Sequence, residues 1–162
     1  MNPAKNKEFE DFYEQTARGA GVYVRCLCRR GAEAEDIVHD GYLAALRQWD
    51  SFSGCGSRRA WLIGILRNTF LAWNRRRRVR QMISLGLAGD IVDPRAAADG
   101  AEDGALWEAV EKLDQDHREI IYLRFAGGLS YAEMAQVLKI ADGTVRSRLH
   151  RALQELKERL KP

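Results

Sequence analysis

Five arginines occupy seven positions in the stretch from Asn74 to Arg80, directly behind a run of apolar and aromatic residues. A guanidinium group is permanently charged and pairs with phosphate in a bidentate geometry, so such a run can hold a nucleic-acid backbone. The same composition also suits a disordered basic tail, a localisation signal or a solvated helix face. The neighbouring elements must distinguish these interpretations.

A second group of basic and hydroxyl side chains lies near the C-terminus, in "GGLSYAEMAQVLKIADGTVRSRLHRALQEL". Ser130 and Glu133 are spaced as a capping box that begins one helix, and Thr144 is expected to cap the next. "KIADG" between them is typical of a turn, with Gly143 able to adopt a positive φ. We therefore predict a helix-turn-helix.

The second of these helices has an apolar back, formed by Val145, Leu149, Ala152 or Leu153, Leu156 and Leu160. Its opposite side presents Arg146, Ser147, Arg148, His150 and Arg151. Arginine can pair with guanine in the major groove, while serine and other arginines hold phosphates. The alternative is an ordinary amphipathic helix pair with a basic surface, but the capping box, turn and basic face together favour DNA binding.

The net charge of +3 conceals four blocks of different charge. Residues 1–50 carry −2, and residues 51–89 contain eight arginines and no acidic residue. Residues 90–138 carry −7, and residues 139–162 carry +4. Two basic blocks around an acidic one indicate two contacts with a polyanion, separated by a spacer that does not bind it.

Helical periodicity dominates the first half of the chain. We expect a helix from about Lys7 to Ala17, a break at "RGAG", and a short apolar segment from Val22 to Cys28. "GAEAEDIVHDGYLAALRQWDSF" predicts a helix whose core-facing residues are Val38, Tyr42, Ala45 and Trp49, with Leu43 and Leu46 exposed. "RRAWLIGILRNTFLAWNRRRR" predicts a helix whose apolar stripe is Leu62, Ile65, Leu66, Thr69 and Trp73.

Residues 83–104 lack a helical stripe and are rich in glycine and alanine, so we interpret them as an acidic linker. A second helical unit begins at Ala105. Asp116 and Glu119 are spaced as a capping box for a helix carrying the apolar residues Ile120, Ile121, Leu123 and Phe125.

Several functional classes lack support in the sequence. The cysteines (Cys26, Cys28, Cys55) and histidines (His39, His117, His150) do not have zinc-ligand spacing, so we expect no metal or other cofactor. The thiols are interpreted as structural, with a redox role for Cys55 as the alternative. Neither a glycine-rich phosphate loop nor a nucleophile–base pattern is present, so we do not expect an enzyme. Without a signal peptide or an apolar run of about 20 residues, a cytoplasmic protein is expected.

On these motifs the chain resembles bacterial RNA polymerase sigma factors of the extracytoplasmic-function (ECF) type, in the sigma-70 family. "LDQDHREIIYLRFAGGLSYAEMAQVLKIADGTVRSRLHRALQEL" is similar to region 4. "AEAEDIVHDGYLAALRQWDSF" and "SRRAWLIGILRNTFLAWNRRRR" are similar to regions 2.2 and 2.3 to 2.4. The resemblance implies an all-α fold of two small helical domains: region 2 over residues 1–82, a flexible linker over 83–104, and the region 4 helix-turn-helix over 105–162.

The resemblance also implies a function and its partners. Region 2 would bind the clamp coiled coil of the largest subunit of core RNA polymerase, then melt and hold the minus-ten element of promoter DNA. Region 4 would lie near the polymerase flap and read the minus-thirty-five element as duplex, and an anti-sigma factor would regulate the chain. The alternative is a helix-turn-helix regulator that acts without polymerase, with residues 1–82 for sensing or dimerisation; it leaves the basic block 51–89 without a role.

The resemblance implies three sets of site residues. In the family, the loop matching "FSGCGSR" captures a flipped base, on which Phe52 or Trp61 could stack; core packing is the alternative for both rings. The minus-ten set is Phe52, Ser53, Gly54, Cys55, Arg58, Arg59, Trp61, Arg67, Asn68, Asn74, Arg75, Arg76, Arg77 and Arg78. The minus-thirty-five set is Arg124, Ser130, Tyr131, Asp142, Thr144, Arg146, Ser147, Arg148, His150 and Arg151. The polymerase set is Asp36, His39, Asp40, Leu43 and Arg47.

Overall fold

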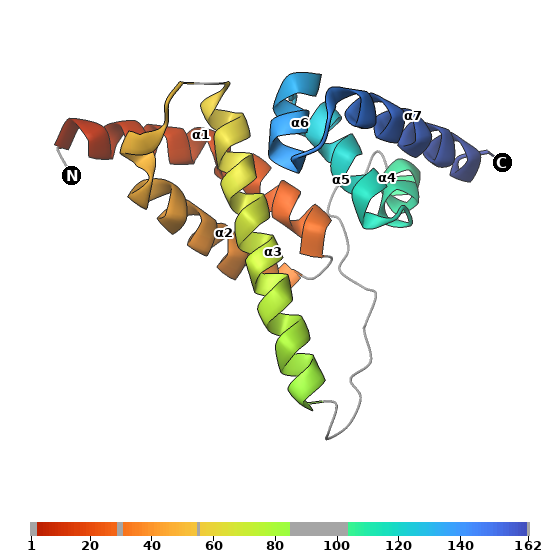
Figure 1. Cartoon of the computed structure of the whole chain (residues 1–162), viewed down its shortest axis with the longest axis horizontal. Coiled ribbons are helices and arrows are strands. Elements are labelled where there is room, and N and C mark those ends of the chain that lie inside the picture. The colour runs from red at the N-terminus through yellow and green to blue at the C-terminus, as the bar shows by residue number, and fades with distance from the viewer. Residues whose placement is uncertain (1–2, 29–30, 55, 85–103, 162) are drawn as a thin grey trace.

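The computed structural model describes residues 3–28, 31–54, 56–84 and 104–161, and the elements within these segments are all helical (Figure 1). The all-α fold class predicted from the sequence is confirmed. Cys55 and residues 85–103 of the predicted linker lie outside the described residues. The α-helices are α1 (Pro3–Cys28), α2 (Gly31–Arg47), α3 (Arg58–Ser84), α4 (Gly104–Glu111), α5 (Gln115–Ile121), α6 (Tyr131–Leu138) and α7 (Asp142–Arg159), with a 3₁₀ turn η1 (Trp49–Ser51) and a π-helical turn η2 (Tyr122–Ala126). No helix in the described segments is long and apolar enough to cross a membrane.

Helix α1 is continuous, so the break predicted at "RGAG" is wrong. Each glycine in a helix costs about 1 kcal/mol relative to alanine. Burial of Tyr23 and Val24, which are 4% and 0% exposed, outweighs this cost, since burying a valine side chain alone contributes about 1.5–3 kcal/mol. Tertiary packing therefore overrides the local signal.

Helices α1, α2 and α3 pack around an apolar core that includes Ile37, Leu62 and Leu66. Gly41 allows α2 to approach α3 closely, because a Cβ at this position would lie 2.5 Å from Cδ2 of the buried Leu66. The C-terminal half of α3 continues well beyond this bundle as a projecting helix (Figure 1). The arginine run is therefore part of a helix and not a separate tail.

In the second half, α4 to α7 pack around Leu113, Ile120, Leu123 and Met134. The π-helical turn ends when the Gly127 amide donates to the Tyr122 carbonyl at 2.7 Å. A Cβ at Gly127 would lie 2.7 Å from the Leu123 carbonyl oxygen, so this close backbone approach requires glycine. Phe125, which the sequence analysis grouped with the apolar residues of this helix, is 65% exposed on this turn.

The helix starts confirm one capping prediction and correct two. The Ser130–Glu133 capping box is present at the start of α6. The box predicted for Asp116 and Glu119 is wrong, because Asp114 caps α5 by accepting the His117 amide at 2.8 Å. Helix α7 begins at Asp142 without a side-chain cap, so Thr144 lies inside it.

The turn between α6 and α7 also differs from its prediction. Gly143 belongs to α7, and the left-handed conformation occurs at Lys139, with φ of 56°. Lys139 ends α6 by donating its amide to the Ala135 carbonyl. A lysine therefore adopts the conformation that was expected of the glycine.

The two halves of the chain pack against each other through α1, α3, α5, η2 and α6. At this interface the Glu119 carboxylate, in a residue 2% exposed, accepts from the Tyr23 hydroxyl at 2.7 Å and from Nε of Arg67 at 2.8 Å. The adjacent Arg118, 1% exposed, donates to the Cys26 carbonyl at 2.8 Å and to the Leu113 carbonyl at 3.0 Å. Burial and the Glu119 charge raise the pKa of Tyr23, so its hydroxyl remains the donor.

We expect Glu119→Ala to lower the free energy of unfolding by about 3 kcal/mol, because it leaves the Tyr23 hydroxyl and the half-buried Arg67 cation without their shared acceptor. Urea denaturation measures this loss. Glu158→Ala is the matched control, since its pair with Lys161 is exposed and should contribute about 0–1 kcal/mol. Equal effects of the two substitutions would contradict the assignment.

Candidate nucleic-acid interface

The loop between η1 and α3 carries the residues predicted to capture a base. Gly54 and Gly56 both have positive φ, at 77° and 81°, which glycine adopts without steric cost. The ring of Phe52 lies 5.6 Å from the ring of Trp61, and each residue is half-buried. Both rings therefore take part in packing and still present some surface beside the exposed loop residues Ser53 and Gly54.

Arg58 closes this aromatic cluster. Its guanidinium lies 4.5 Å from the centre of a Trp49 ring and 5.5 Å from that of Phe52, and it pairs with Glu8 of α1. These contacts attach the start of α3 to both η1 and α1. Arg58 is thus held in place by packing and by a carboxylate, whereas its neighbour Arg59 is exposed.

The same loop contacts the helix-turn-helix. The Ser57 amide donates to Oε1 of Glu133 at 3.2 Å, and Oε2 of that carboxylate accepts from the Ser130 amide at 2.9 Å. The hydrogen bonds from Ser57 and Ser130 hold the pKa of Glu133 down to about 2. One carboxylate therefore caps α6 and ties it to the predicted base-capturing loop.

The middle of α3 carries three predicted minus-ten residues in different surroundings. Arg67 has a side chain 17% exposed and is bound to Glu119. Asn68 is exposed, and Asn74 is half-buried. In this compact arrangement Asn68 is accessible to a ligand, whereas Arg67 is already paired.

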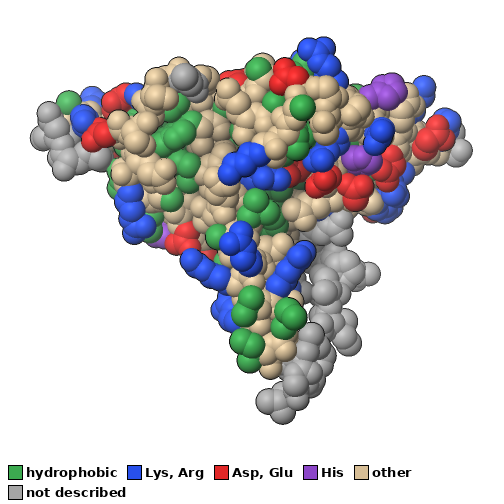
Figure 2. Space-filling view, viewed as in Figure 1, with side chains coloured by type: hydrophobic (Ala, Val, Ile, Leu, Met, Phe, Trp, Pro, Cys, Tyr) green, Lys and Arg blue, Asp and Glu red, His purple; other side chains and the backbone are tan. Residues whose placement is uncertain are grey.

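The arginines of the run have different surroundings, because Arg77 has partners within the fold and the others are exposed. Nη1 of Arg77 lies 3.7 Å from Oε2 of Glu33, and its guanidinium lies 5.5 Å from the Trp73 ring centre. The other arginines of the run are exposed on the projecting end of α3, and they are Arg75, Arg76, Arg78 and Arg80. Figure 2 shows basic side chains on this end, above a hydrophobic tip. The exposed apolar residues of this end are Val79, Met82 and Ile83.

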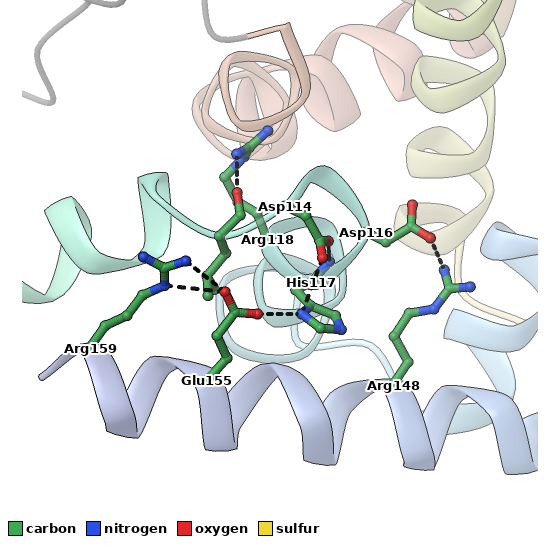
Figure 3. Close-up of polar contacts among 8 residues, drawn as sticks. Asp114, Asp116, His117, Arg118, Arg148, Glu155 and Arg159 are labelled. Atoms are coloured by element: carbon green, nitrogen blue, oxygen red, sulfur yellow. Dashed lines mark hydrogen bonds and ion pairs between the residues drawn. The ribbon is translucent and has the colours of Figure 1, made fainter.

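Helix α7 presents the predicted recognition surface. Its exposed members are Asp142, Thr144, Arg146, Ser147, His150 and Arg151. Arg148 differs from these exposed residues in being half-buried and already paired. Its Nη1 lies 3.1 Å from Oδ2 of Asp116 at the start of α5 (Figure 3). Ser147 donates its hydroxyl to the Thr144 carbonyl at 3.1 Å. Thr144, Ser147, Arg148 and Arg151 border a hollow of about 370 Å³ between α5 and α7.

The remaining predicted minus-thirty-five residues lie where η2, α6 and α7 meet. Ser130 uses its hydroxyl in the capping box, where Oγ accepts the Glu133 amide. Tyr131 is half-buried and has the guanidinium groups of Arg124 and Arg146 over its ring. This junction therefore gathers basic residues from two helical elements around one aromatic side chain.

A polar group that was not predicted joins α5 to α7 (Figure 3). Potential ligand atoms of Asp114, His117 and Glu155 all lie within 4.8 Å of one another. Nδ1 of His117 is 2.8 Å from Oε2 of Glu155, whose other oxygen accepts from Arg159 at 2.8 Å. Arg159 and His117 lower the pKa of Glu155. Arg159 already binds Glu155, and Asp114 already caps α5. The contacts of this group therefore serve to connect α5 with α7.

The predicted polymerase-binding residues share one exposed face of α2. Asp36, His39, Asp40, Leu43 and Arg47 are all exposed, at the spacing of one helix surface. Leu43 is 37% exposed, whereas Leu46 is half-buried, so the expectation of two exposed leucines holds for Leu43 alone. A mixed charged and apolar helix face of this kind is suited to another protein.

The chain matches two protein families over most of its length. Residues 12–80 match sigma-70 region 2, and residues 103–156 match sigma-70 region 4. It is 35% identical to the ECF RNA polymerase sigma factor EcfG of Rhodopseudomonas palustris, over 76% of this chain and 68% of the relative. It is 30% identical to the RNA polymerase sigma factor YlaC of Bacillus subtilis, over 93% and 91% of the two chains.

A similar solved structure is the sigma factor RpoE in complex with the anti-sigma factor NepR from Bartonella quintana. The similarity has a TM-score of 0.80 and 32% identity, and covers 95% of this chain and 97% of that one. The structural similarity therefore includes both the region 2 half and the region 4 half of this chain.

The low pKa of Glu133 predicts how the capping contact depends on pH. Because the folded-state pKa lies below the ordinary value of 4.5, the carboxylate stabilises the fold above about pH 5, and this contribution is lost as pH falls toward about 2. Unfolding free energies of the natural chain and Glu133→Gln should therefore differ most near neutral pH and converge in acid. Glu108→Gln, at an exposed position of α4, is the control. A difference that stays constant with pH would contradict this role.

Proposed function

The chain belongs to the sigma-70 family of RNA polymerase sigma factors, to its ECF type, and from this premise we propose that it binds core RNA polymerase and directs initiation at specific promoters. The observation that carries the proposal is the presence in one chain of regions 2 and 4, each displaying a basic helix. In this proposal the chain is a regulatory subunit that works in the cytoplasm and leaves the chemistry to the polymerase. Residues 1–82 form the polymerase and minus-ten domain, 83–104 the linker, and 105–162 the minus-thirty-five domain.

Region 2 has two faces suited to its two partners. The exposed face of α2 contacts the polymerase clamp, with Leu43 as its apolar centre and charged residues around it. On α3, Asn68 contacts the non-template strand, and the exposed arginines of the projecting end hold phosphates. Arg77 is assigned a structural role, because Glu33 and Trp73 already engage it.

Region 4 places α7 in the major groove of the minus-thirty-five element. The apolar back of α7 is buried through Val145, Leu149, Ala152 and Leu156, which leaves its basic side to face DNA. Arg148 is the candidate for reading a base. It must exchange the Asp116 carboxylate for DNA, so the net gain from its contact depends on both interactions.

Promoter binding also requires a change in the compact arrangement. Arg67 is bound to Glu119, and the loop amide of Ser57 is bound to Glu133, so region 4 occupies groups that region 2 offers to DNA. Contact of Arg67 with the non-template strand therefore needs the two halves to separate. The related RpoE structure contains an anti-sigma factor, and we expect that a partner of this kind would favour the compact arrangement of this chain.

Run-off transcription with core polymerase over a promoter library tests the proposal. The natural chain should give initiation at a defined set of promoters that core polymerase alone does not use. Arg148→Ala should weaken minus-thirty-five recognition by about 1–3 kcal/mol, whereas Lys157→Ala, an exposed change near the other end of α7, should have little effect.

Two outcomes would count against the proposal. If the chain bound promoter-like duplex tightly without polymerase and failed to support initiation, the polymerase-independent regulator would be favoured. If Arg148→Ala transcribed as well as the natural chain, the assignment of this residue to base reading would be wrong.

A further inference from the structure

Tyr131, the first residue of α6, lies beside two arginines that come from different elements. The guanidinium carbon of Arg124, from η2, is 5.2 Å from the centre of the tyrosine ring. That of Arg146, from α7, is 4.9 Å from the same centre. Both arginines are exposed, while Tyr131 is half-buried. A single ring thus joins three elements at the DNA-facing side of the helix-turn-helix.

The contacts are attractive and directional. A guanidinium within about 6 Å of an aromatic ring centre is attracted by the negative face of the ring. Arg124 is further fixed because its Nη1 donates to the Leu129 carbonyl at 3.0 Å. Two arginines this close to one ring would otherwise repel each other and move apart. The ring therefore holds both guanidinium carbons within 5.2 Å of its centre before any ligand arrives.

Unlike the carboxylates that pair with Arg148 and Arg67, the Tyr131 ring carries no charge. Arg148 is paired with Asp116 and Arg67 with Glu119, so DNA must displace a carboxylate at each. Among the described residues, Asp and Glu oxygens all lie more than 4.0 Å from the nitrogens of Arg124 and Arg146. Arg124 and Arg146 can therefore bind an anion without giving up an opposite charge.

We propose that Tyr131 is a positioning residue whose ring holds Arg124 and Arg146 as a preformed clamp for one backbone phosphate of the minus-thirty-five duplex. The clamp rests on the proposed function of region 4. A phosphate offers several acceptor oxygens and a negative charge, which matches two guanidinium groups held by one ring. The clamp fixes the register of α7 on the DNA and contributes affinity without selecting a base.

Promoter binding by the full chain with core polymerase, measured over a range of salt concentrations, tests the clamp. Tyr131→Phe keeps the ring and should bind within about twofold of the natural chain, since the attraction does not need the hydroxyl. Tyr131→Leu keeps apolar bulk but loses the ring, and should bind about tenfold more weakly. Its log–log salt slope should fall by up to about 0.9, the contribution of the one phosphate contact that the clamp makes.

A double-mutant cycle separates positioning from general damage. Arg146→Gln should cost much less in the Tyr131→Leu background than in the natural one, because the clamp is already disordered there. Arg151→Gln, also exposed on α7 but not over this ring, should cost the same in both backgrounds. Unfolding temperatures of all variants check that α6 and α7 remain folded.

Three results would overturn the clamp: unchanged binding and salt slope in Tyr131→Leu, an equal loss in Tyr131→Phe, or additive effects of Tyr131→Leu and Arg146→Gln. The second result would mean that the hydroxyl contacts DNA directly. Failure of the natural chain to initiate with polymerase would instead contradict the proposed function, so the two failures are distinguishable.

Discussion

A buried carboxylate must have partners, and Glu119 finds both of its partners in the other half of the chain. Tyr23 and Arg67 donate to it from α1 and α3, where a charge left unpaired would cost several kcal/mol. This requirement sets how α5 sits against α1 and α3. It thereby places α6 beside the region 2 loop, where Ser57 donates to Glu133. The compact arrangement therefore depends on polar contacts as well as on the shared apolar core.

The acidic block of residues 90–138 acquires a role that its charge alone did not reveal. The sequence suggested a spacer that stays away from polyanions. Three of its acids instead bind groups within the two basic blocks: Asp116 with Arg148, Glu119 with Arg67, and Glu133 with Ser57. Under the proposed function these acids would compete with DNA for the same donors, so the charges that favour the compact state would also oppose premature contact with nucleic acid.

Much of the helical architecture could be predicted from the sequence, because apolar spacing and capping residues are local signals. The α6 capping box and the buried stripe of Val145, Leu149 and Leu156 followed directly. The continuity of α1 could not be predicted, since it depends on burial of Tyr23 and Val24 against other helices. The α5 cap was predicted at Asp116 but lies at Asp114, because both aspartates are suitable cap residues and the fold uses only one.

The candidate site was harder to predict, because the partners of each arginine come from distant parts of the chain. From the sequence alone, Arg67, Arg77 and Arg146 share one description as basic residues on a helix. In the fold, one is bound to a buried carboxylate, one is held by Glu33 and Trp73, and one lies over Tyr131. The group of Asp114, His117 and Glu155 shows the same difficulty, since Glu155 is distant in sequence and close in space.

The central claim is that the contacts of Glu119 and Glu133 hold a compact state that opens on the polymerase. The most direct measurement is the distance between dyes attached at Glu10 of α1 and Lys157 of α7, both exposed, by single-molecule energy transfer. The account predicts one compact distance in the free chain and a clearly longer one in the complex with core polymerase and promoter DNA. The same distance in both states would contradict it.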